Sequence, residues 1–71
     1  GKAEGKIEMI CKFLGCKFGL KALKLQKKAQ KITDLTILDD ITGQIFLSES
    51  LQAIEKIIKE ALDVQESMKE K

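Results

Sequence analysis

Apolar residues recur every three or four positions in several segments of this chain, and no proline interrupts any of them. That spacing places the apolar side chains of a segment on one face of a helix. Proline inside a helix costs about 3 kcal/mol, so its absence leaves the whole chain free to be helical. The sequence therefore predicts an all-α fold, a small bundle of about four helices, three of them short and the C-terminal one long.

Glycine separates the first two expected helices. Residues 1–6 lack apolar anchors and are expected to form a frayed lead-in, so the first helix begins at residue 7. It is expected to end at Gly19, because glycine readily adopts the left-handed conformation that ends many helices. The second helix then begins at residue 21 or 22. Its narrow apolar stripe consists of Ala22, Leu25, Ala29 and Ile32.

Polar capping residues mark the last two helices. Thr33 or Asp34 is expected to cap the third helix, and Ser48 or Ser50 the fourth, because side-chain oxygens at these positions accept hydrogen bonds from free backbone N–H groups. The β-branched residues in the third segment also suit a strand, but no other segment alternates in a way that would pair with it. The polar tail, residues 66–71, is expected to fray.

The small size of the chain indicates a partner. Seventy-one residues make one domain, residues 1–71, and so small a core rarely contributes more than about 3–5 kcal/mol of stability. The usual supports are disulfides, a structural metal, regular helix packing or oligomerisation. With no histidine and only two cysteines, a zinc site cannot be completed by this chain alone. We therefore expect the bundle to self-associate as a homodimer or a higher oligomer.

The two cysteines, Cys11 and Cys16, do not form a CxxC motif and are too few for a secreted disulfide framework. We expect free thiols in the cytoplasm. No apolar run approaches the roughly 18 residues that a membrane-spanning helix needs, so we expect no membrane partner.

Several large apolar residues lie outside the main stripes of their helices. A sizeable exposed apolar patch on a small monomer usually marks an interface. The predicted interface residues are Met9, Phe13, Leu20, Leu23 and Ile57.

Charge is unevenly distributed along the chain. Residues 1–32 hold nine lysines and two acids, whereas residues 33–71 hold four lysines and nine acids. This asymmetry suggests either pairing between the two halves or contact of the first half with nucleic acid. The alternative function is therefore a small nucleic-acid-binding module. Its phosphate-binding residues would be Lys21, Lys24, Lys28 and Lys31, although the chain has no arginine or asparagine to read bases.

No catalytic constellation is evident. Without histidine there is no Ser–His or Cys–His pair. Glu4-Gly5-Lys6 has the E-x-K spelling of a nuclease motif but no partner aspartate upstream. Asp39 and Asp40 are adjacent, so on a helix their side chains diverge by about 100°. We expect neither catalysis nor a metal or organic cofactor.

Short motifs along the chain resemble the C-terminal domain of Rpn-type proteins, the recombination-promoting nucleases and transposases of the PD-(D/E)XK class. The resemblance covers residues 1 to about 62, but Leu20-Lys21 stands where many relatives have Leu-Pro. The motifs that carry it are Glu4-Gly5-Lys6, Leu14, Lys17-Phe18-Gly19, Lys31-Ile32, Leu38-Asp39-Asp40-Ile41 and Ser50-Leu51-Gln52-Ala53-Ile54.

This resemblance implies that the nuclease site lies in an upstream domain and that the present chain is a non-catalytic accessory domain. It also implies a partner, the full-length Rpn-type nuclease, which the short domain would restrain in the manner of an antitoxin in phage defence.

Overall fold

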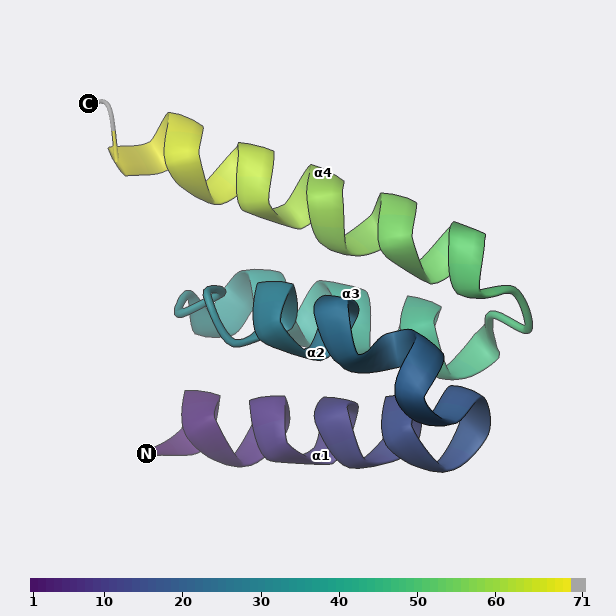
Figure 1. Cartoon of the computed structure of the whole chain (residues 1–71). Coiled ribbons are helices and arrows are strands. Elements are labelled where there is room, and N and C mark those ends of the chain that lie inside the picture. Colours follow the sequence, from purple (N-terminus) through teal and green to yellow (C-terminus); the bar gives the residue numbers. More distant parts are fainter. Residues whose placement is uncertain (70–71) are drawn as a thin grey trace.

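The computed structural model describes residues 1–69, and within that range it is all helical, as predicted (Figure 1). The 3₁₀ helix η1 links the first two α-helices directly, and no strand occurs in the described part of the chain. The elements are α1 (Lys2–Phe18), η1 (Gly19–Ala22), α2 (Leu23–Ala29), α3 (Leu35–Leu47) and α4 (Leu51–Lys69).

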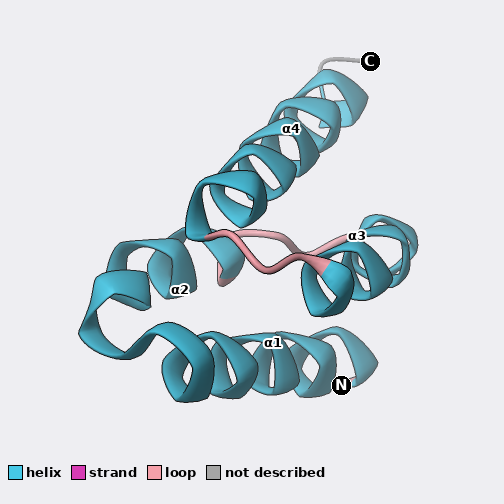
Figure 2. Cartoon of the chain, turned by 90° about the vertical axis from the view of Figure 1, so that its right-hand side faces the viewer, coloured by secondary structure: helices cyan, strands magenta, loops and turns pink. Residues whose placement is uncertain are grey.

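The helices surround one core, with α1 and α4 on opposite sides and α2 and α3 between them (Figures 1 and 2). Both α1 and α4 pack against both of the middle helices. The order around the core is therefore α1, α2, α4, α3, and helices that follow each other in the chain run in opposite directions. As a consequence, α1 and α3 are parallel neighbours, and so are α2 and α4.

The expected apolar stripes form this core. Thirteen apolar residues are buried, and the largest fully buried ones come from every part of the bundle. They are Ile10, Leu14, Ile32, Leu38, Ile45, Ile54 and Ile58.

The lead-in predicted for residues 1–6 is wrong, because α1 begins at Lys2. Ala3 lies one helical turn before Ile7, and both pack against the core, which extends the apolar stripe to the start of the helix. With 17 residues, α1 is nearly as long as the 19-residue α4, so only α2 and α3 are short.

Two other helix boundaries differ from expectation. Gly19 does end α1, with φ of +64°, but the chain continues at once as η1 rather than as a loop. At the other end, residues 66–69 belong to α4, although they were expected to fray, and residues 70–71 of that predicted tail lie outside the described range.

The capping prediction holds for Asp34, whose Oδ1 accepts a hydrogen bond of 3.0 Å from the backbone N–H of Ile37. Ser50 precedes α4, and its Oγ accepts a bond of 3.4 Å from the N–H of Ala53. Ser48 ends α3 instead of starting α4.

A single buried amide holds the turn between α2 and α3. Gln65 on α4 is only 6% exposed, and its Oε1 accepts hydrogen bonds from the backbone N–H groups of Thr33, at 2.8 Å, and Asp34, at 3.1 Å. Its Nε2 donates to the carbonyl oxygen of Lys31 at 3.0 Å. One side chain thus satisfies three backbone groups of a turn that neither adjoining helix could satisfy.

Replacement of this amide is expected to be costly. Gln65→Leu keeps an apolar side chain of similar size but leaves these three backbone groups without their partner. Each unsatisfied buried group costs roughly 1–3 kcal/mol, and partial access of water reduces the sum, so we expect a loss of about 2–4 kcal/mol in the free energy of unfolding. Urea denaturation at low micromolar protein measures it. Gln52→Leu, at an exposed position on the same helix, is the control, and an equal loss in both variants would contradict the assignment.

Close approach of α1 and α2 depends on Gly15. A Cβ at that position would lie 3.1 Å from Nε2 of Gln26, the group that donates a hydrogen bond of 2.9 Å to the carbonyl oxygen of Cys11. A Cβ at Gly5 on the same helix meets nothing within 4 Å.

We therefore expect replacement of glycine by alanine to raise the stability at Gly5 and to lower it at Gly15. Gly5→Ala raises stability by about 0.5 kcal/mol, because alanine favours helix more than glycine does. Gly15→Ala has the same intrinsic gain but displaces Gln26, so it ends about 1 kcal/mol less stable than Gly5→Ala. Thermal unfolding of the two variants side by side tests this, and equal gains would show that Gln26 does not hold α2 on α1.

Candidate interaction surface

The parallel pair α1 and α3 is joined by contacts that follow the same order along both helices. Near their first turns, Lys6 Nζ forms an ion pair with Asp39 Oδ1. Two turns further on, the rings of Phe13 and Phe46 pack with their centroids 4.8 Å apart and a tilt of 45°. Such tilted aromatic pairs are worth about 0.5–1.5 kcal/mol beyond the area they bury.

Lys17 closes the end of this pair. Its Nζ donates a hydrogen bond of 2.9 Å to the carbonyl oxygen of Ser48, the residue that ends α3. The same ammonium group lies 5.5 Å from the ring centroid of Phe13 and 5.7 Å from that of Phe18, within cation–π range. Lys17 therefore ties the end of α1 to the α3–α4 connection.

Exposed apolar side chains lie along and beyond this contact. Met9, one helical turn before Phe13, is 52% exposed, and Phe46 is 38% exposed. At the end of the pair, Leu47 and Leu20 are 86% and 88% exposed. We refer to Met9, Phe13, Phe46, Leu47 and Leu20 together as the α1/α3 apolar face.

The predicted interface residues do not form one patch. Met9 and Phe13 share a face of α1, and Leu20 lies in η1, just after the end of that helix. Leu23 is half exposed at the start of α2. Ile57 is partly buried and lines a separate groove of about 180 Å³ between α3 and α4.

Phe46 and Leu47 are surface residues that the sequence did not single out. Phe46 lies next to the periodic position of Ile45, so apolar spacing alone favours its burial with the stripe of α3. Leu47 lies at the last position of α3. The clue in the sequence was a run of three large apolar residues at the end of an amphipathic helix, more than one face can bury.

The four predicted phosphate-binding lysines are all exposed. Lys21 lies in η1, Lys24 and Lys28 lie in α2, and Lys31 follows α2. None of them forms an ion pair with any residue in the range 1–69. The only ion pair that joins the basic first half to the acidic second half within this range is Lys6–Asp39.

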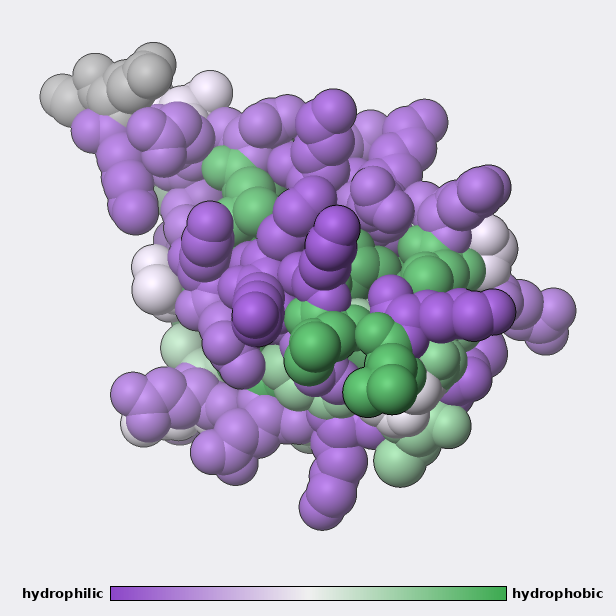
Figure 3. Space-filling view, viewed as in Figure 1, coloured by the Kyte–Doolittle hydropathy of each residue, from purple (hydrophilic) through white to green (hydrophobic). Residues whose placement is uncertain are grey.

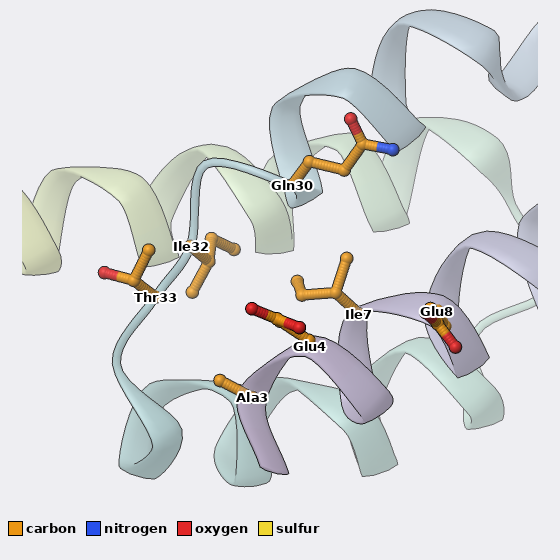
Figure 4. A pocket seen from close by; sticks show the side chains of 7 residues that line it. All are labelled: Ala3, Glu4, Ile7, Glu8, Gln30, Ile32 and Thr33. Carbon is orange, nitrogen blue, oxygen red and sulfur yellow. The ribbon is translucent and has the colours of Figure 1, made fainter. Parts of the chain in front are cut away.

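An open pocket of about 490 Å³ lies between the start of α1 and the α2–α3 turn (Figure 4). Ile7 and Ile32 lie across it from each other, and Glu4 and Glu8 are on its α1 side. The E-x-K spelling does not become a site here, since Lys6 pairs with Asp39 on a different face of α1 from Glu4. Among residues 1–69, no three histidine, cysteine, aspartate or glutamate side chains are placed to hold a metal ion together.

The two cysteines are free and differ in exposure. Cys11 is partly buried against α2, with its Sγ 3.8 Å from the carbonyl oxygen of Gln26, and this burial raises the pKa of its thiol above the ordinary value. Cys16 is exposed on α1.

Comparison of the chain with protein-family models, with curated proteins and with solved structures gives no match in any of the three. In the described part of the chain, no helix combines the length and the apolar character needed to cross a bilayer.

The difference between the two thiols is directly measurable. Because thiolate is the reactive form, the raised pKa of Cys11 lowers its reactive fraction at pH 8, and burial limits its access. We expect iodoacetamide to modify Cys16 at least about 10-fold faster than Cys11, as followed by peptide mass spectrometry. The rates should converge in urea, and fast modification of a Cys16→Ser variant under native conditions would contradict the packing of Cys11.

Proposed function

We propose that this chain is a non-catalytic helical interaction domain that self-associates through the α1/α3 apolar face. The observation that carries the proposal is the near-complete exposure of Leu20 and Leu47, which lie where α1 and α3 end, together with the partly exposed Phe46 that packs on Phe13. Burying a leucine side chain stabilises an interface by roughly 1.5–3 kcal/mol, so these two residues alone supply a substantial driving force.

Charge favours a second copy as the occupant of this face. Within residues 2–18, α1 carries four lysines and two glutamates, whereas α3 carries Asp39 and Asp40 and no basic residue. A two-fold axis parallel to the helices places α1 of one copy against α3 of the other, so a helix of net positive charge twice faces a helix of net negative charge. An axis perpendicular to the helices places α1 against α1 and α3 against α3, so that helices of like net charge face and repel each other.

The resemblance to Rpn-type proteins supplies the biological setting of the proposal. A domain that pairs with itself also pairs with the same domain in a longer nuclease, and by occupying that domain it would restrain the nuclease like an antitoxin. The proposal places the chain in the cytoplasm, where two free thiols stay reduced, and it needs neither cofactor nor metal.

Sedimentation of charged variants tests the proposed surface. We expect the wild-type chain to sediment as a concentration-dependent dimer in the micromolar range. In the double variant Leu20→Lys and Leu47→Lys the dissociation constant should rise at least about 100-fold, because two leucines lose their burial and two like charges approach. Both positions are exposed, so the helical content should not change.

Val64→Lys is the matched control, since Val64 is also exposed but lines the α3/α4 groove that contains Ile57. It should dimerise like the wild type. A monomeric wild-type chain at several hundred micromolar would overturn the proposal, and loss of the dimer in Val64→Lys alone would move the interface to the α3/α4 groove.

A further inference from the structure

A ridge of unpaired positive charge follows η1, α2 and the turn after it. Residues 9–33 contain no acid at all, and five exposed lysines lie within the eleven positions 21–31. Within residues 1–69, none of the five forms an ion pair. This lysine ridge consists of Lys21, Lys24, Lys27, Lys28 and Lys31.

The length of the ridge matches a phosphate backbone. From residue 21 to residue 31 the chain comprises the end of η1, α2 and the start of the turn, and it extends about 15 Å. Over that distance one strand of duplex DNA presents about four phosphates. We propose that the lysine ridge binds the phosphate backbone of double-stranded nucleic acid without reading its sequence.

The composition of the ridge favours a nucleic-acid backbone over an acidic protein. Lysine is depleted in protein–protein interfaces, whose centres are apolar and rich in aromatic residues and arginine. Reading base edges most often uses arginine or asparagine, and the chain contains neither. The three phenylalanines of the chain lie on α1 and α3, so no aromatic platform accompanies the ridge to stack the bases of a single strand. These features together fit contact with duplex phosphates.

Most of the ridge lies on a different helix from the α1/α3 apolar face, and the two surfaces meet only in η1, where Leu20 precedes Lys21. In the order α1, α2, α4, α3 around the core, α2 lies diagonally opposite α3 (Figure 2). Figure 3 views the molecule from the side of α2 and α4, where hydrophilic residues cover most of the surface and hydrophobic ones gather over η1 and the beginnings of α2 and α4. The inference therefore stands without the proposed dimer.

Fluorescence anisotropy with a labelled 20-base-pair DNA duplex tests the ridge. With about four lysines on phosphates, log K should fall with log salt concentration at a slope of about −3.6, so the affinity should drop about 100-fold between 50 and 200 mM KCl. Duplexes of different sequence should bind equally. In the variant Lys24→Gln and Lys28→Gln the slope should decrease by about 2, and the affinity at 50 mM KCl should fall at least about 10-fold.

The variant Lys56→Gln and Lys59→Gln removes the same charge from α4, a different helix from those of the ridge, and should retain most of the affinity. Equal losses in the two variants would show that net charge rather than the ridge binds the duplex. Absence of binding at 50 mM KCl overturns the proposal, and so does binding to vesicles of anionic phosphatidylserine without binding to the duplex. Circular dichroism establishes that both variants keep the helical content of the wild type.

Discussion

The fold depends on how the turn between α2 and α3 is satisfied. This turn crosses the bundle, because α2 and α3 lie diagonally across the core and make few contacts with each other. Its backbone groups face α4, where a purely apolar stripe would leave them without partners at considerable cost. Gln65 offers both an acceptor and a donor from one buried side chain, and so allows an apolar helix face to pack on a polar turn.

The order of the helices around the core follows from that crossing. Since the chain passes from α2 across the core to α3, α3 becomes the neighbour of α1 and runs parallel to it. Parallel helices end at the same side of a bundle, so the end of α1 meets the end of α3, where Lys17 bonds to Ser48. The exposed leucines that follow or precede these ends, Leu20 and Leu47, are therefore at one end of the molecule. The surface proposed for self-association is thus a consequence of topology as well as of composition.

Local signals in the sequence were sufficient for the helices, the core and the caps of α3 and α4. The stripes that contain Leu14, Leu25 and Ile58 are buried as periodicity predicts, because each depends only on its own helix. The helical start of α1 could not be predicted in the same way, because a single alanine is a weak signal of burial, although Ala3 does pack on the core. Contacts between helices could not be predicted from the sequence, because the pairing of Phe13 with Phe46 depends on the α2–α3 crossing. The spacing does place Gln65 on the stripe of α4, four residues after Ala61, but nothing local shows which backbone groups its amide meets.

Attraction between the basic first half and the acidic second half of the chain contributes little to the stability of the fold. The basic half forms the antiparallel pair α1 and α2, and the acidic half forms the antiparallel pair α3 and α4. If opposite charges held these two pairs together, several ion pairs would join them, yet within residues 1–69 only Lys6–Asp39 does. Exposed ion pairs contribute at most about 1 kcal/mol, so leaving the α2 lysines unpaired costs the fold little. Their unneutralised charge instead produces a positive potential that acts over the Debye length of about 8–10 Å. In a dimer formed through α1 and α3, the two ridges would lie on opposite outer sides, so one stiff duplex could not contact both and each ridge would bind its own duplex.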